Sequence, residues 1–229
     1  MNFLLARVSP GGYLGLHLTV GILLLIGASW IFGGIAEDVV TGDPLIVADN
    51  HVAEWFHHRM TQRLTAVIQV ISDLGSPLWV TCISAGIGLA LLWKRRWYRL
   101  LAWALVIPGG VIVGFFLKLA FHRSRPSFED ASFVFQGFGF PSGHTMIAVL
   151  LYGLLAAFAV RSFDARRWRA LSVAGAGIMV LLIGLSRLYL GAHFVSDVLG
   201  GIASGVAWLA LSLTAAETLR RNRGHRSKP

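Results

Sequence analysis

The hydrophobic residues of this 229-residue chain occur in long runs that short polar segments interrupt. A helix of about twenty apolar residues crosses the roughly 30 Å hydrocarbon layer of a bilayer. Six runs reach or approach that length, so we predict an all-α membrane bundle of six transmembrane helices in a single domain, residues 1–229. The predicted spans cover residues 14–36, 74–93, 100–121, 144–160, 171–190 and 194–216.

Composition supports the same class of protein. Hydrophobic residues make up 55% of the chain, charged residues 14%, and the mean hydropathy is +0.68, which excludes an ordinary soluble domain. The single cysteine excludes an internal disulfide framework and a cysteine-rich metal cluster. The net charge of +9 arises from short basic clusters between apolar runs, which is typical of topology signals beside lipid headgroups. No nucleic-acid partner is therefore expected.

The basic residues also predict the orientation of the chain. Fourteen Lys and Arg residues fall in one set of connections and termini, and six fall in the other. By the positive-inside rule both termini, including the basic tail 217–229, should be cytoplasmic. The acidic segment 37–63 should then lie outside, with a short surface helix within residues 49–60.

Several polar residues are predicted at the outer ends of different spans. With a rise of 1.5 Å per residue, the distances from the basic inner ends place Lys118, His144 and Arg187 at the outer interface. The last predicted span begins on that side with His193 and Asp197. Helices distant in sequence therefore deliver these residues to one face of the membrane.

Three of the cations indicate an anion site. Lys118, Arg125 and Arg187 would repel one another unless an anion lay between them, and the arginine fork suits phosphate oxygens. Ser142 and Gly143 precede a predicted helix, whose free N–H groups and dipole favour a bound anion. A simple helix cap by Ser142 is the structural alternative.

His193 and Asp197 are four residues apart and would share a helix face. Asp197 would accept a hydrogen bond from one ring nitrogen and leave the other free as a nucleophile. His144 would act as a general acid. A metal half-site or a structural hydrogen bond would explain the same pair. A turn at Gly191 is needed to bring Arg187 and His193 to one site.

Three motifs thus stand in order: KLAFHRSRP at 118–126, PSGH at 141–144 and SRLYLGAHFVSD at 186–197. Together they resemble the signature of the type 2 phosphatidic acid phosphatase superfamily, K-x6-RP, PSGH and SR-x5-H-x3-D, with every defining position filled. The resemblance covers residues 118–197. It implies a membrane phosphatase similar to bacterial enzymes that act on phosphatidylglycerophosphate, undecaprenyl pyrophosphate, phosphatidic acid or a related lipid.

The resemblance also implies residue roles and a setting. His193 would form a phosphohistidine, Asp197 would orient it, and His144 would protonate the leaving lipid oxygen and then activate water. No metal or other cofactor is expected, because carboxylates are too sparse for a divalent cage. The expected setting is the cytoplasmic membrane, with the site facing outward and no obligate protein partner evident. The residues that would hold the phosphoryl oxygens are Lys118, Arg125, Ser142, Gly143 and Arg187.

Two alternative functions stay open. A lipid phosphotransferase of the same superfamily would use an acceptor other than water. A transporter or flippase would need ionisable groups or helix breaks at mid-depth, for which His17, Asp73 and the Pro108-Gly109-Gly110 segment are candidates. The same three residues at 108–110 would also allow close helix packing.

Two further polar features have structural explanations that we favour. The Arg123 side chain is expected to snorkel toward lipid headgroups. His51, Glu54, His57 and His58 could form a zinc cluster, but they fit better as polar residues of an external amphipathic helix.

Overall fold

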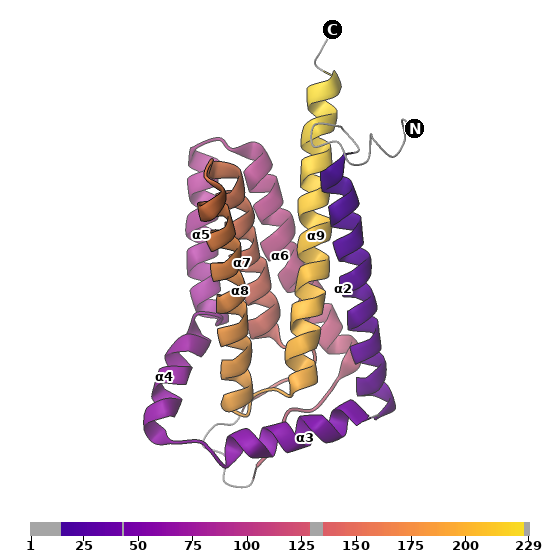
Figure 1. Ribbon diagram of the computed structural model, residues 1–229, viewed down its shortest axis with the longest axis vertical. Helices are drawn as coiled ribbons and strands as arrows, with labels where there is room; N and C mark the ends of the chain where they lie inside the picture. Colours follow the sequence, from indigo (N-terminus) through magenta and orange to yellow (C-terminus); the bar gives the residue numbers. More distant parts are fainter. Residues whose placement is uncertain (1–14, 43, 129–134, 227–229) are drawn as a thin grey trace.

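The computed structural model describes residues 15–42, 44–128 and 135–226, apart from the side chains of Pro44 and residues 224–226. These residues form eight helices and, within the described ranges, no strand. Six segments are long and apolar enough to cross a membrane, which confirms the predicted all-α bundle (Figure 1). The helices are α2 (Leu16–Thr41), α3 (Pro44–His57), α4 (Gln62–Asp73), α5 (Pro77–Trp93), α6 (Trp97–Phe121), α7 (Gly143–Ser162), α8 (Arg166–Tyr189) and α9 (Val195–Arg226).

The predicted spans match the long helices, with two differences: one additional helix and one helix that continues further than predicted. Helix α3 confirms the surface helix, but α4 was not predicted, because its apolar residues alternate with polar ones and form no twenty-residue run. Helix α9 continues to Arg226, past the predicted end at residue 216. Glu217 pairs with Arg220 and Arg221, three and four residues further on, and such pairs stabilise a helix.

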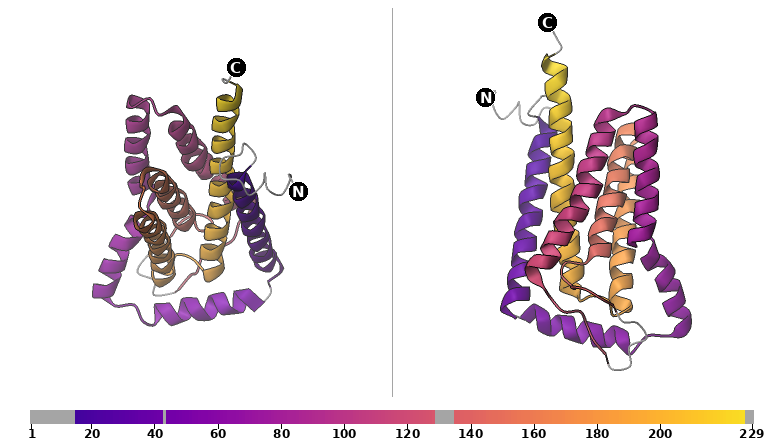
Figure 2. Two further views of the ribbon diagram at one scale, coloured as in Figure 1. Left: turned by 45° about the horizontal axis from the view of Figure 1, so that its top comes forward. Right: turned by 180° about the vertical axis from the view of Figure 1, so that it is seen from behind.

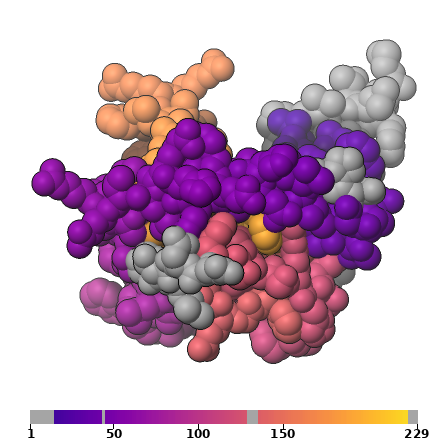
Figure 3. Space-filling model, turned by 90° about the horizontal axis from the view of Figure 1, so that it is seen from below, coloured from indigo at the N-terminus to yellow at the C-terminus, as the bar shows by residue number. Residues whose placement is uncertain are grey.

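The long helices lie side by side, and α3 crosses the bundle at one end (Figures 1 and 2). α6 ends, α7 begins, α8 ends and α9 begins at the end where α3 lies. Viewed from below, α3 forms a band across this face (Figure 3). The start of α2 and the end of α9 lie at the opposite end.

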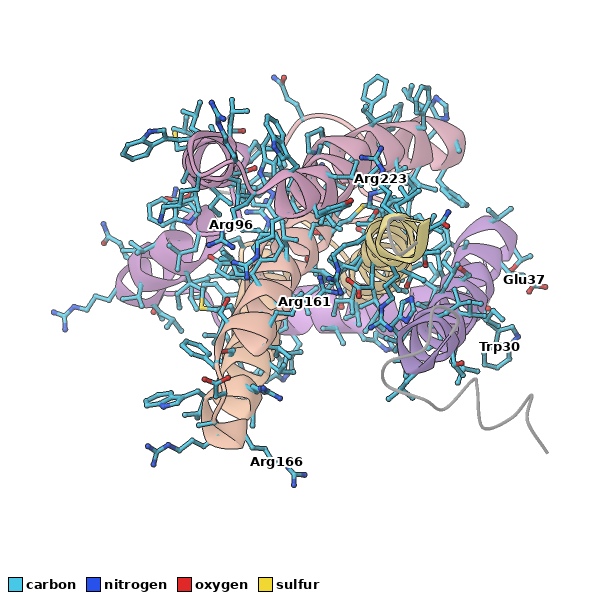
Figure 4. All side chains as sticks on the ribbon, turned by 90° about the horizontal axis from the view of Figure 1, so that it is seen from above. Trp30, Glu37, Arg96, Arg161, Arg166 and Arg223 are labelled. Carbon is cyan, nitrogen blue, oxygen red and sulfur yellow. The ribbon has the colours of Figure 1, made fainter. Side chains whose placement is uncertain are left out.

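The core lies between α5, α6 and α7. Val106, Leu150 and Leu154 are fully buried, and Val80 and Met146 contact the same cluster. The outer surfaces of the bundle expose large apolar side chains, such as Trp30, which is 81% exposed and points away from α2 (Figure 4). Such a surface suits lipid, because water would penalise so much exposed apolar area.

Helix α6 runs without interruption through Pro108. A Cβ at Gly109 would lie 2.9 Å from the Trp208 ring, and the Trp208 Nε1 donates to the Leu105 carbonyl at 2.9 Å. The glycines therefore allow α9 to pack closely against α6, while the indole satisfies a carbonyl near the proline. The broken helix that a transporter would need at this point is absent from the described residues of α6.

Candidate active site

The three motifs meet at the end of the bundle that α3 crosses. A cavity of about 310 Å³ opens there between α5, α6 and α7. Five of the eight predicted site residues line this cavity, and Ser142, Arg187 and Asp197 lie against those five. The lining residues are Lys118, Arg125, Gly143, His144 and His193.

A tight turn brings the third motif back on itself. Helix α8 ends in a reversal in which the Gly191 N–H donates to the Leu188 carbonyl and the Ala192 N–H to the Arg187 carbonyl, both at 3.0 Å. Gly191 has φ +65°, a left-handed conformation that glycine adopts without steric cost. The predicted turn at Gly191 is confirmed. His193 consequently precedes α9 rather than lying on it.

The histidine pair is buried and oriented. His193 is 2% exposed, and its Nδ1 lies 3.4 Å from Oδ2 of Asp197. The same oxygen accepts from the Phe194 N–H at 2.9 Å, which fixes the carboxylate at the start of α9. Nε2 lies 3.3 Å from Nη1 of Arg125. With the proton on Nδ1, Nε2 presents its lone pair to the cavity.

Burial controls the charge of this imidazole. Loss of hydration lowers the pKa of His193 to about 4, although the hydrogen bond and charge of Asp197 act in the opposite direction. Arg125 is affected in the same way, because burial lowers the pKa of its guanidinium while Asp197 opposes the shift. At neutral pH His193 is therefore a neutral base beside a positively charged arginine.

Among the residues with a described structure, the three predicted anion-binding cations form hydrogen bonds only with neutral groups. Lys118 Nζ donates to the Phe138 carbonyl at 2.7 Å, and Arg125 donates to the Gly137 and Ala192 carbonyls at 3.0 Å. Carbonyl oxygens do not neutralise a full positive charge. Among the described residues, no carboxylate lies within ion-pair distance of Lys118 or Arg125.

Arg187 has the same character. It is 5% exposed, and its Nη1 donates to the Ser72 hydroxyl at 2.7 Å. Its Nε is buried and has no hydrogen-bond partner among the residues that the structure describes, which is costly for a charged donor. The Arg187 and Arg125 guanidinium carbons lie 5.1 and 5.9 Å from the centre of the same ring, Phe135. An anion between the two arginines would satisfy donors that the described protein groups leave unused.

The start of α7 is also poised toward the cavity. Ser142 is fully buried at the N-cap position, yet its side chain accepts no backbone N–H. It accepts instead from the Thr145 hydroxyl at 3.0 Å, which leaves its own proton available. Ser142 is thus the N-cap residue of α7, but its side chain forms no capping hydrogen bond with the described backbone. A Cβ at Gly201 would lie 2.7 Å from the Ser142 carbonyl, so α9 approaches this turn closely only because residue 201 is glycine.

The prediction for Arg123 is wrong. Its side chain is 10% exposed and bridges two carboxylates, Asp49 and Asp197, at 2.8 Å each. Asp49 is fully buried in α3 and also accepts from the Ser196 N–H at 2.9 Å and from the Ser196 hydroxyl. Buried charge is tolerated only when it is paired, and both carboxylates satisfy that need better than headgroups would.

Sequence reasoning missed two residues that bind arginines at this end of the bundle, Asp49 of α3 and Ser72 of α4. Asp49 is one of five acidic residues in segment 37–63, and no local pattern separates it from the other four. Asp73, next to Ser72, is exposed at the end of α4. No group of three or more metal-ligating side chains was found among the described residues, which include the four that we considered as an alternative zinc cluster.

Comparison with known proteins places this arrangement in a family. The profile of the PAP2 superfamily matches residues 97–221. The chain belongs to the PAP2 superfamily. Phosphatidylglycerophosphatase B of Bacillus subtilis is 33% identical over 162 residues, which cover 70% of this chain and 79% of that protein. Lipid A 1-phosphatase of Rhizobium etli is 30% identical over 171 residues, 64% of this chain and 68% of that protein.

Solved structures agree with the fold. The crystal structure of a transmembrane PAP2 type phosphatidylglycerolphosphate phosphatase from Bacillus subtilis matches with a TM-score of 0.74 and 27% identity, covering 89% of this chain and 97% of that one. LpxE of Aquifex aeolicus shares the fold at a TM-score of 0.57. The PAP2 protein described here is a multi-pass membrane lipid phosphatase.

Proposed function

We propose that this PAP2 protein hydrolyses a lipid phosphate or lipid diphosphate without a metal, through a phosphohistidine on His193. The observation that carries the proposal is the placement of His193, whose Nδ1 faces Asp197 and whose Nε2 faces the cavity beside Arg125. The uncompensated cations around that nitrogen support a phosphoryl group as the occupant.

In the first step, His193 Nε2 attacks phosphorus and the bond from phosphorus to the lipid oxygen breaks. His144, which lines the same cavity, donates a proton to that leaving oxygen. Bound phosphate favours the protonated imidazole through its negative charge. Asp197 stabilises the positive charge that develops on the His193 ring.

In the second step, His144 takes a proton from water, the water oxygen attacks phosphorus, and the bond to His193 breaks to release inorganic phosphate. Lys118, Arg125 and Arg187 hold the phosphoryl oxygens together with the Ser142 hydroxyl and the Gly143 N–H. Fixed cations in a shielded site neutralise the oxygens in the way that Mg²⁺ does in other phosphoryl-transfer enzymes.

The cavity supports a lipid rather than a soluble ester. Beyond the charged residues its lining is apolar and includes Val111, Phe115 and Met146. Val111 and Phe115 are 48% and 58% exposed on the outer surface of α6, the surface that faces lipid in a six-span bundle. A lipid would enter sideways with its phosphate leading. Phosphatidylglycerophosphate and lipid A phosphates, which the names of the relatives specify, are the first substrates to test.

The charge distribution supports an outward-facing site and cytoplasmic termini in the cytoplasmic membrane. Fourteen of the twenty Lys and Arg residues fall, by sequence position, in the connections and termini that we predict to be cytoplasmic, and short basic connections remain cytoplasmic. Cysteine labelling with a membrane-impermeant maleimide, at Gln69 in α4 and at Asp164 between α7 and α8, tests this orientation in intact cells.

The decisive experiment traps the intermediate. The purified full-length protein is mixed with a lipid labelled with ³²P in its terminal phosphate and quenched in alkali, in which phosphohistidine survives. We expect label on the wild-type protein and on His58→Ala, an exposed histidine control, and neither label nor turnover with His193→Ala. Turnover by a folded His193→Ala protein would refute the proposed nucleophile.

A second arm separates the two histidines. His144→Ala should accumulate labelled protein with a p-nitrophenyl phosphate ester, because nitrophenolate leaves without protonation while the water step still lacks its base. The same variant should label poorly with a lipid monophosphate, whose alkoxide leaving group needs a proton. Equal labelling with both substrates would contradict the role of His144.

A further inference from the structure

A second cavity lies at the end of the bundle opposite the active site. Its volume is about 750 Å³, and it lies between the start of α6, the end of α7 and the last turns of α9. Along α9, Asp197 and Glu217 are about 30 Å apart at 1.5 Å per residue, so the two cavities are separate. We call this second one the basic cavity. Its basic residues are Arg95, Arg96, Arg99, Arg161, Arg220 and Arg221.

One carboxylate organises half of these arginines. Glu217 is 4% exposed and lies 2.7 to 2.9 Å from nitrogen atoms of Arg161, Arg220 and Arg221. Three guanidinium groups share a single negative charge, and the other three bring the excess to five positive charges on the described lining. Topology signals require basic residues in short loops, but they do not require convergence on one buried acid.

Arg95 is held in a conformation that costs free energy. It follows the end of α5 at φ +51°, and the turn around it is completed by the Arg96 N–H donating to the Leu91 carbonyl at 2.9 Å. Glycine is favoured at this position because other residues are strained there by about 1 kcal/mol or more. In the part of the chain that the structure describes, neither Arg95 nor Arg96 has a side-chain hydrogen bond or ion pair. Local stability therefore does not explain why residue 95 is an arginine.

The rest of the lining fits an amphiphile. Besides the arginines, the cavity is lined by the apolar side chains of Ala102, Phe158 and Leu213 and by the rings of Trp97 and Tyr98. Tryptophan and tyrosine are typical of the membrane interface. A free phosphate ion would contact the arginines but leave these apolar side chains in contact with water. A phospholipid would cover both parts, and basic pockets between membrane helices bind anionic headgroups.

We propose that the basic cavity binds the phosphate headgroup of an anionic phospholipid in the leaflet opposite the active site. Arg95, Arg96 and Arg99 contact the phosphate, and the glycerol and first acyl carbons lie on Phe158 and Leu213. Glu217 holds the remaining arginines in place.

The test uses a variant that removes charge without harming the fold. Arg95→Gly places glycine at its preferred left-handed position, and Arg96→Ser places a favoured residue at the N-cap of α6. The matched control, Arg166→Gln with Arg167→Gln, removes two charges at the same end of the bundle. At that end Arg166 points outward, whereas Arg96 and Arg161 lie nearer the centre of the bundle (Figure 4). Equal charge removal also controls for effects on membrane insertion.

The measurement is the Tm of the full-length protein in zwitterionic detergent. It is recorded at increasing concentrations of dioctanoyl phosphatidylglycerol, dioctanoyl phosphatidylcholine or inorganic phosphate. We expect phosphatidylglycerol to raise Tm in the wild type, the α8 control and Arg125→Gln. The Arg95→Gly/Arg96→Ser variant should need about 30-fold more of this lipid, since each arginine near an anionic headgroup contributes about fivefold.

Three results would overturn the proposal. An equal Tm shift with phosphatidylcholine would show that headgroup charge is irrelevant. A full shift with inorganic phosphate at the same concentration would identify a free anion as the ligand. Loss of the shift in Arg125→Gln, with the Arg95→Gly/Arg96→Ser variant unchanged, would place the lipid in the active site.

Discussion

Replacing Asp49 with alanine tests whether the surface helix α3 is part of the catalytic structure. Asp49 is fully buried, 2.8 Å from Nη2 of Arg123 and 2.9 Å from the Ser196 N–H. The substitution leaves the Arg123 guanidinium, which is 10% exposed, with one carboxylate instead of two. It also removes the acceptor for a donor in the first turn of α9.

The size of the effect follows from this burial. Removing one partner of a buried ion pair costs about 3–5 kcal/mol, which for a chain of this size corresponds to a fall in Tm of about 10 °C. Arg123 also contacts Asp197, so the change should shift the carboxylate that orients His193. We expect kcat to fall about tenfold with little change in KM, since a small displacement of a catalytic group has effects of that order.

The assay combines thermal unfolding in detergent with phosphate release by the same preparation. Glu54→Gln is the matched control, because it removes an exposed carboxylate from the same helix. In a double-mutant cycle, Asp49→Ala combined with Arg123→Gln should cost at least about 1 kcal/mol less than the sum of the single changes, because the double change leaves neither member of the Asp49–Arg123 pair without its partner. Wild-type Tm in Asp49→Ala, or strict additivity in the cycle, would refute the buried-network argument.

Four further outcomes are expected. Because burial lowers the pKa of His193 to about 4, the acid limb of kcat/KM, corrected for substrate ionisation, should lie near pH 4; a limb near 6.5 would contradict a buried neutral nucleophile. The unfolded chain takes up this proton near pH 6.5, so unfolding free energy should decline by up to about 3 kcal/mol as pH falls from 6.5 to 4; constant stability across that window would argue against the shift. Ser142→Ala should lower kcat about 100-fold, because the loss of one transition-state donor has an effect of that size, and Tm should be nearly unchanged. A large fall in Tm with a normal kcat would instead show that the role of Ser142 is structural. Arg187→Lys should raise the inhibition constant of vanadate at least tenfold, since lysine lacks the planar fork. Ser72→Ala should raise the same constant by a smaller factor. An unchanged inhibition constant in both variants would exclude Arg187 from the anion site.

Much of the site was predictable because it depends on short-range geometry. The rise per residue placed Lys118, His144 and Arg187 at one end of the bundle, and the spacing of Arg187 and His193 required the turn found at Gly191. Helix-sized apolar runs gave the six spans. These inferences need only helix parameters and local sequence.

Other features depend on contacts that no local pattern encodes. Asp49 and Arg123 are 74 residues apart, and their pairing depends on how α3 crosses the end of the bundle. Helix α4 has no continuous apolar run, and α9 continues past the predicted end at residue 216, where Glu217 pairs with the arginines that follow it. A basic loop such as residues 94–99 has the same sequence whether it only sets topology or also lines a cavity.

The arginines of this protein fall into groups according to the partners that neutralise their charge, and not according to how deeply they are buried. Arg123 is buried between two carboxylates, so its charge is satisfied and its effect is on structure. Arg187 is buried and Arg125 half-buried at the same end, but their described hydrogen bonds go to carbonyls, a hydroxyl and the His193 imidazole, which leaves their charge for an incoming anion. At the opposite end, Arg95 and Arg96 also form no ion pair with any carboxylate in the described part of the chain. The partner of each guanidinium, which becomes known only with the fold, therefore indicates whether it stabilises the protein or binds phosphate.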